Sequence, residues 1–79
     1  MRTFNVFVSH DAKDGVWFVE SSDIPGLNAE AHSYEQLVEV VLDLTPELID
    51  VNITDDRDNL PNIPVCVQYK AMAKRVHAN

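Results

Sequence analysis

One stretch of the chain, residues 33–54, carries helical periodicity, and this single helix is the feature that most limits the possible folds. Apolar residues recur there at intervals of three or four, as on one face of a helix: Leu37, Val41, Leu44 and Leu48. Ser33 is a good N-cap, and Gln36 stands three residues later, as in a capping box. Pro46 either kinks this helix or begins a second short one. A lone helix buries its apolar face only against another layer, so the rest of the chain has to supply a sheet.

The segments around the helix alternate in hydrophobicity, which predicts strands over residues 3–9, 16–21 and 63–70. A short polar segment at 28–32 is expected to add an edge strand. The resulting order, β-β-β-α-β, predicts an α+β fold in which a small antiparallel sheet packs on one kinked helix. The 79 residues make one domain, 1–79, that ends in a basic tail at 71–79.

The predicted sheet is apolar on both faces. Alternation places one set of residues under the helix: Phe4, Val6, Val8, Val16, Phe18, Val65, Val67 and Tyr69. The opposite face then carries polar residues and four large apolar ones: Phe7, Trp17, Val19 and Met72. Because an exposed aromatic patch usually marks a protein interface, these four residues are predicted to form a partner or oligomer interface. The alternative is that Phe7 and Trp17 lie apart, partly covered by polar neighbours.

Charge is distributed unevenly along the chain. Residues 1–69 hold all 13 Asp and Glu against three cations, a net charge of −10, whereas the last ten residues add Lys70, Lys74 and Arg75 and no acid. An acidic body repels nucleic-acid phosphates and attracts basic partners, although acidity can also serve solubility alone. The three late cations are candidate contacts to phosphate or to the acidic surface. They are too few to predict DNA binding by this chain alone.

The sequence contains no pattern typical of an active site, metal centre or cofactor. His10 lies beside the acids of the first hairpin loop, but no nucleophile with a base and an orienting partner emerges. The acidic run at 55–59 lacks the glycine and the bidentate Glu of an EF-hand, and the histidines have no zinc-ligand spacing. Cys66, the single cysteine, falls in an alternating apolar run and is expected to be a packed or inert thiol rather than a nucleophile. We therefore expect no catalytic residue, no metal and no cofactor. With no signal peptide and no membrane-spanning stretch, the predicted location is the cytoplasm.

Three short motifs occur in order: Asp14-Gly15-Val16-Trp17-Phe18-Val19, Asp23-Ile24-Pro25-Gly26-Leu27 and Ser33-Tyr34-Glu35-Gln36-Leu37. In this order the chain resembles HicB-like antitoxins and, more closely, their short relatives classed as a domain of unknown function. The resemblance covers residues 4 to about 54. Asp23, Pro25 and Gly26 form its signature turn, in which Pro25 fixes φ and Gly26 allows a conformation that other residues resist.

The resemblance implies both a fold and a role. The fold is a small sheet with one helix, a degenerate half of an RNase H-like domain. HicB-type proteins of type II toxin–antitoxin systems bind a small basic mRNA-cleaving toxin, HicA, and mask its catalytic histidine. They assemble as dimers or tetramers, and many carry a C-terminal DNA-binding domain for which this chain has no room, so operator binding is not expected. The predicted function is thus a non-enzymatic interaction domain of the antitoxin kind. The alternative is a self-associating regulatory or scaffolding domain without a toxin partner.

Overall fold

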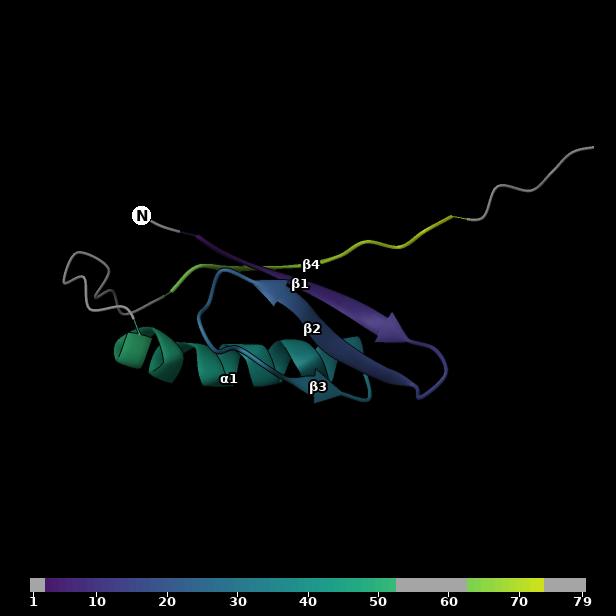
Figure 1. The fold of residues 1–79 in the computed structure, drawn as a ribbon, viewed down its shortest axis with the longest axis horizontal. Helices are drawn as coiled ribbons and strands as arrows, with labels where there is room; N and C mark the ends of the chain where they lie inside the picture. The colour runs from purple at the N-terminus through teal and green to yellow at the C-terminus, as the bar shows by residue number, and fades with distance from the viewer. Residues whose placement is uncertain (1–2, 53–62, 74–79) are drawn as a thin grey trace, which may run out of the picture.

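The computed structural model describes residues 3–52 and 63–73 (Figure 1). Five elements follow one another along the chain: β1 (Phe4–Asp11), β2 (Val16–Ser22), β3 (Glu30–Ala31), α1 (Tyr34–Asn52) and β4 (Val65–Tyr69). The predicted α+β fold and the order β-β-β-α-β are confirmed. β3 and β4 are both shorter than the predicted strands, and β1 extends further than predicted, to Asp11.

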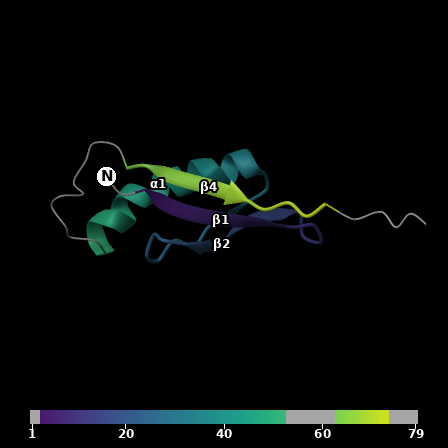
Figure 2. The same ribbon diagram turned by 90° about the horizontal axis from the view of Figure 1, so that it is seen from above.

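The four strands form one sheet in the order β3-β2-β1-β4. β1 pairs antiparallel with β2, and β2 pairs antiparallel with β3, but β4 runs parallel to β1. The prediction of a wholly antiparallel sheet is therefore wrong in this detail. The reason is that α1 is a crossover connection, which carries the chain from the β3 edge to the opposite edge and delivers β4 in the direction of β1 (Figures 1 and 2).

α1 covers one face of the sheet, and the core lies between these two layers (Figure 1). Its buried apolar members come from β1, from the turn after β2 and from α1: Phe4, Val6, Val8, Ile24, Leu37, Val41 and Ile49. Thr45 is the buried polar residue of this region, and its hydroxyl donates to the Val41 carbonyl at 2.6 Å. The alternation of β1 and the helical spacing of α1 therefore meet in one core, as the sequence predicts.

The start of α1 is capped as expected. The Gln36 N–H donates to the Ser33 hydroxyl at 3.1 Å, and the Leu37 N–H donates to the Ser33 carbonyl at 3.0 Å. Pro46 lies inside a helix that continues to Asn52, so the alternative of a second helix beginning at Pro46 is wrong.

The turn between β2 and β3 is anchored in the core. Gly26 has φ +77°, the left-handed region that favours glycine, and the Leu27 N–H donates to the Ile24 carbonyl at 3.3 Å. The Ile24 backbone N–H donates to the Ser22 hydroxyl at 2.9 Å, and the Ile24 side chain is buried. The Pro-Gly turn thus places one apolar side chain under the helix.

A β-bulge determines which way the side chains of β2 point. Phe7 pairs with Ser21, but the next residue of β1, Val8, pairs with Val19, so Glu20 is an extra residue in β2. Because paired residues share a face, Val19 lies with Val8 on the helix side. The predicted placement of Val19 opposite the helix is therefore wrong.

The same pairing reverses the other assignments made for β2. His10 pairs with Trp17, and both Trp17 and Val19 pack against the core, so the predicted placement of Trp17 opposite the helix is also wrong. Ser9 pairs with Phe18, which moves Phe18 to the uncovered face together with Val16. Residues 16–19 are apolar without a break, so alternation alone cannot orient them.

Among the helices of residues 3–52 and 63–73, none is long and apolar enough to cross a membrane.

Candidate functional site

The sheet has one face that no described helix covers, which we call the open face. Its side chains come from three strands: Asn5, Phe7 and Ser9 of β1, Phe18, Glu20 and Ser21 of β2, and Cys66 and Gln68 of β4. Phe7 lies at the centre of this face, beside Ser21 on one side and Gln68 on the other, and it is 42% exposed. The open face is thus a polar surface with an exposed aromatic ring in its middle.

One end of the open face is organised by a polar network. Asp23 Oδ2 accepts hydrogen bonds from the Asn5 backbone N–H at 2.9 Å and from Asn5 Nδ2 at 3.2 Å. Asn5 Oδ1 in turn accepts a hydrogen bond from Gln68 Nε2 at 3.2 Å. The network ties the signature turn to β1 and β4. The Asp23 carboxylate therefore has a structural task in this fold.

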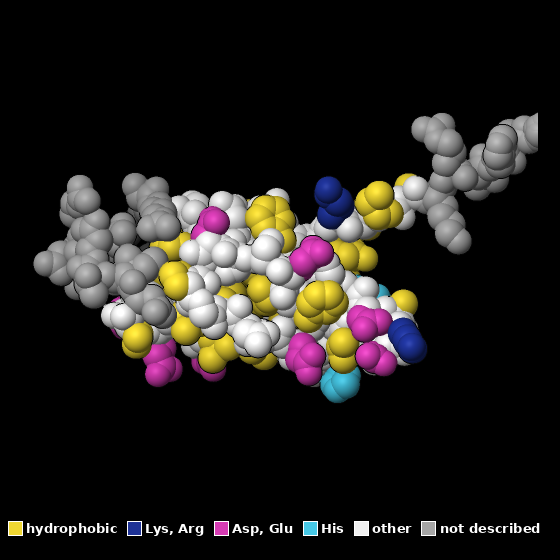
Figure 3. All heavy atoms as spheres, viewed as in Figure 1, with side chains coloured by type: hydrophobic (Ala, Val, Ile, Leu, Met, Phe, Trp, Pro, Cys, Tyr) yellow, Lys and Arg dark blue, Asp and Glu magenta, His cyan; other side chains and the backbone are white. Residues whose placement is uncertain are grey.

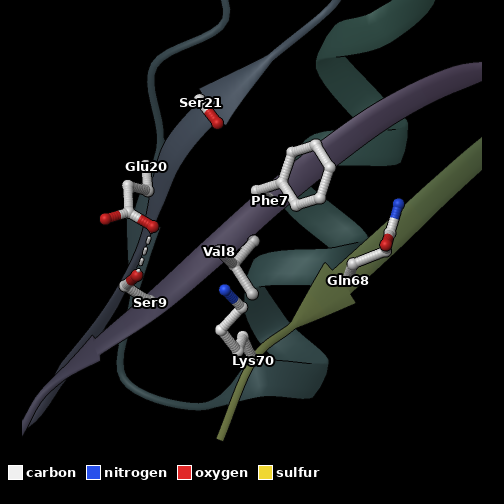
Figure 4. Close-up of a pocket in the computed structure, with 7 residues that line it drawn as sticks. All are labelled: Phe7, Val8, Ser9, Glu20, Ser21, Gln68 and Lys70. Carbon is white, nitrogen blue, oxygen red and sulfur yellow. Dashed lines mark hydrogen bonds between the residues drawn. The ribbon is translucent and has the colours of Figure 1, made fainter.

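The other end of the open face is hollowed. The hollow is shallow, about 500 Å³ in volume, and it is lined by Phe7, Val8, Ser9, Glu20, Ser21, Gln68 and Lys70 (Figure 4). Within it the Ser9 hydroxyl donates to Glu20 Oε2 at 2.9 Å. Because Glu20 is the extra residue of the bulge, the bulge and the hollow coincide.

The hollow combines hydrogen-bonding groups with an apolar ring. Its lining offers two hydroxyls, an amide, one carboxylate and one ammonium group around the Phe7 ring, with no His or Cys side chain among them. These groups are able to accept or donate hydrogen bonds and to contact an apolar side chain of a partner. Lys70, predicted as a phosphate or acidic-surface contact, borders this hollow, whereas Lys74 and Arg75 lie outside the described residues.

An aromatic cluster stands on the helix side of the sheet. Trp17 is its centre: the ring of His10 stacks on it with centroids 4.7 Å apart, and Tyr34 and Tyr69 contact it edge-on at 5.5 Å and 4.7 Å. Tyr69 is 44% exposed, so the cluster reaches the surface at one end of the sheet. It joins β1, β2, β4 and the first residue of α1.

The four residues predicted as an interface are therefore not brought together. Phe7 lies on the open face, Trp17 and Val19 pack against the core on the helix side, and Met72 follows β4 with 82% of its surface exposed. Sequence reasoning placed Gln68 on this face correctly but missed Phe18 and Glu20 as members of it. The polar run of residues 20–22 at the end of an apolar strand was the available signal for the bulge.

The outer side of α1 carries the densest charge of the described molecule. Five exposed acids lie along it, and we call them the acidic helix surface: Glu35, Glu39, Asp43, Glu47 and Asp50. α1 contains no Lys or Arg. Among the residues that the structure describes, Lys13 and Lys70 are the cations, against ten Asp and Glu. Acidic side chains accordingly outnumber basic ones in the view of Figure 3.

The remaining candidates for chemistry stay apart from one another. Within residues 3–52 and 63–73, no three His, Cys, Asp or Glu side chains form a group able to hold a metal ion. Cys66 is exposed on the open face, so of the two expected alternatives, a packed or an inert thiol, the packed one is excluded. His32 is exposed, His10 stacks on Trp17, and the acidic run at 55–59 and His77 fall outside the described residues.

Comparison with known proteins gives two findings. Residues 3–77 match the family described as "Domain of unknown function (DUF1902)". The chain is also similar to a hypothetical protein, TTHA1013, from the extremely thermophilic bacterium Thermus thermophilus, whose crystal structure is known. The two chains are 34% identical, the alignment covers 96% of this chain and 100% of the other, and the TM-score is 0.68. A comparison with curated proteins gives no match.

Proposed function

The chain belongs to the DUF1902 family, and from that premise we propose that it is a non-enzymatic interaction domain that binds a small basic protein. The partner that fits best is an mRNA-cleaving toxin of the HicA kind, as the resemblance of the motifs to HicB-like antitoxins implies. Binding would then mask the toxin's catalytic histidine.

The acidic helix surface is the observation that carries this proposal. Five carboxylates lie on the solvent side of one helix without a compensating cation in that helix. Like charges one turn apart repel each other and cost the isolated helix about 0.2–0.5 kcal/mol per pair. A basic partner is attracted to these carboxylates and offsets their mutual repulsion. A surface of one charge sign also raises the rate of association with a partner of the opposite sign.

The open face supplies the short-range part of the proposed contact. Charge steers an encounter, but affinity depends on apolar anchors that become buried. Phe7 is such an anchor, because it is exposed at the centre of the open face and flanked by hydrogen-bonding side chains. Because the acidic helix surface lies across the sheet from Phe7, we assign it a contribution to the overall negative field that attracts a basic partner, and we assign the anchoring contact to the region around Phe7.

The test is binding of the purified chain to a HicA-like toxin encoded in the same genome, followed by surface plasmon resonance at two salt concentrations. Glu39→Gln/Asp43→Asn should slow association about tenfold at low salt, and the difference should shrink as salt is raised. Asp14→Asn/Glu30→Gln is the matched control, because it removes the same charge from the hairpin loop and β3, and it should change association much less.

Co-expression provides the functional readout. The wild-type chain should restore growth of cells that express the toxin, and Phe7→Asp should fail to do so while keeping its circular dichroism spectrum. Absence of binding and absence of growth rescue by the wild-type chain would together overturn the proposal. If the two charge variants slow association equally, the acidic helix surface has no special part in binding.

A further inference from the structure

The two edges of the sheet differ in their protection against pairing with another strand. β3 is two residues long and contains Glu30, and both features are typical devices that keep an edge unpaired. β4 has five residues, Val65–Tyr69, with no charge, no proline and no glycine, and its register with β1 contains no bulge. It borders the sheet without a neighbouring strand among the described residues (Figure 2).

The parallel register shows which backbone groups of β4 point outward. Phe4 pairs with Val65, and the Phe4 N–H donates to the Pro64 carbonyl at 2.9 Å. In a parallel ladder the residues that bond to one neighbour alternate along the strand, so Cys66 and Gln68 turn their backbone groups toward β1. The other three residues turn their N–H and C=O groups to the free edge: Val65, Val67 and Tyr69.

The outward carbonyl oxygen of Val67 already has one hydrogen-bond donor, at a long distance. The Tyr34 hydroxyl lies 3.4 Å from the Val67 carbonyl oxygen, which is long for a hydrogen bond from a hydroxyl. A carbonyl oxygen has two lone pairs, so this contact leaves room for a second donor. Within residues 3–52 and 63–73, the β4 edge thus has a nearly complete set of unpaired donors and acceptors.

We propose that β4 pairs antiparallel with β4 of a second copy of this chain, about a two-fold axis at Val67. In this register Val67 faces Val67 of the second copy, and Val65 faces Tyr69 of the second copy. Each outward residue then meets an outward residue, so every free N–H and C=O of the edge gains a partner. The two sheets become one continuous sheet.

The strand is complementary to itself in side chains as well as in backbone. On the helix side the facing pairs are apolar, and on the open face Cys66 meets Gln68 of the second copy. None of the ten described acids lies in β4, so this edge lets two acidic molecules approach without aligning their carboxylates. A closed two-fold contact of this kind is the commonest form of homodimer. It does not depend on the toxin-binding function proposed above.

The small size of the β4 edge limits the expected affinity of the dimer. A five-residue strand pair is smaller than a standard protein interface, so we expect a dimer in the micromolar range that dissociates on dilution. Sedimentation should show the average mass rising from 8.9 kDa toward twice that value as the protein concentration increases. A strict monomer at several hundred micromolar would overturn the proposal.

Cross-linking tests the register itself. In Gln68→Cys the new thiol lies directly opposite Cys66 of the second copy, at a Cα separation of about 4.5 Å that a disulfide can span. Identical positions are diagonal neighbours about 7–8 Å apart, too far for a disulfide. Mild oxidation with diamide should therefore yield a covalent dimer from Gln68→Cys, and little from the wild type or from Cys66→Ser/Gln68→Cys.

Two results of the cross-linking experiment would contradict the proposed register. One is a folded Gln68→Cys that remains monomeric on the non-reducing gel. The other is equal cross-linking of all three proteins, which would indicate random collision of exposed thiols.

Val67→Pro tests the edge without new thiols. Proline removes an outward N–H that takes no part in pairing with β1, and proline is tolerated at such edge positions. The variant should stay at 8.9 kDa in sedimentation, while the control Val67→Thr, which keeps the N–H, should still associate. Circular dichroism monitors the folding of both variants. If Val67→Pro unfolds, the cross-linking of Gln68→Cys decides whether the β4 edges pair. A folded Val67→Pro that associates like the wild type would overturn the proposal.

Discussion

The two faces of the sheet differ sharply in burial, although the same strands form both. Val6 and Phe7 are neighbours in β1, yet Val6 is fully buried under α1 and Phe7 is 42% exposed on the open face. The covered face contains the apolar core, whereas the open face contains hydrogen-bonded polar side chains together with the rings of Phe7 and Phe18. The buried apolar side chains are therefore concentrated on one side of the sheet.

The outward surfaces of the two layers differ as well. α1 presents five carboxylates to solvent, while the acids on and beside the open face are already engaged, Glu20 with Ser9 and Asp23 with Asn5. Unpaired charges act over about 8–10 Å at moderate salt, and hydrogen bonds and apolar contacts act only at close range. The exposed charges of α1 and the exposed ring of Phe7 thus lie on opposite sides of the molecule.

The largest effect should come from the centre of the covered face. Leu37→Ala removes a fully buried side chain and should lower the free energy of unfolding by about 2–5 kcal/mol in a urea titration. Leu42→Ala is the control in the same helix, because Leu42 is 49% exposed, and it should cost less than about 1 kcal/mol. Similar losses for the two variants would contradict the placement of the core.

A pair of aromatic substitutions compares the two faces directly. Trp17→Ala should destabilise the chain by about 2–3 kcal/mol, because Trp17 packs on the core and holds three other rings. Phe7→Ala should cost less than about 1 kcal/mol and should instead weaken partner binding. If Phe7→Ala proves the more destabilising of the two in urea unfolding, the assignment of the faces is wrong.

The orientation of β1 was predictable from sequence, and that of β2 was not. Phe4, Val6 and Val8 share one face at period two, and the polar residues Asn5 and Ser9 mark the other face as the exposed one, so the burial of the first three follows from alternation. In β2, residues 16–19 are all apolar, and the choice between their two faces depends on the bulge at Glu20. A bulge arises from pairing with another strand, which a single strand's sequence does not contain.

Short-range sequence signals predicted where the helix begins and where the chain turns. Ser33 as a cap and Gly26 in a left-handed turn follow from chemistry within a few residues, and both are confirmed. The direction of β4 could not be predicted in this way. Parallel and antiparallel pairing with β1 place the same β4 side chains inward, so the alternation of β4 does not distinguish between them. The hollow of the candidate site depends on the bulge and on Lys70 beyond β4, so no local pattern predicted it.

The smallest effects should come from the polar groups of the open face. Asn5→Ala removes the side-chain link between Asp23 and Gln68 and should cost about 1 kcal/mol in urea unfolding. Ser9→Ala removes one exposed hydrogen bond to Glu20 and should cost less than Asn5→Ala. A loss above about 2 kcal/mol from Ser9→Ala would mean that the open face contributes to stability as much as the covered one.

The parallel pairing of β1 with β4 also has a consequence for how the chain folds. Phe4 pairs with Val65, so the two strands meet only after roughly sixty intervening residues have been made, and such distant contacts slow folding. During synthesis, β1 can form its hairpin with β2 early, while its other edge waits for β4. That edge belongs to the strand that supplies the buried side chains of Phe4, Val6 and Val8, which makes it the place where a nascent chain is most open to aggregation or to chaperone binding.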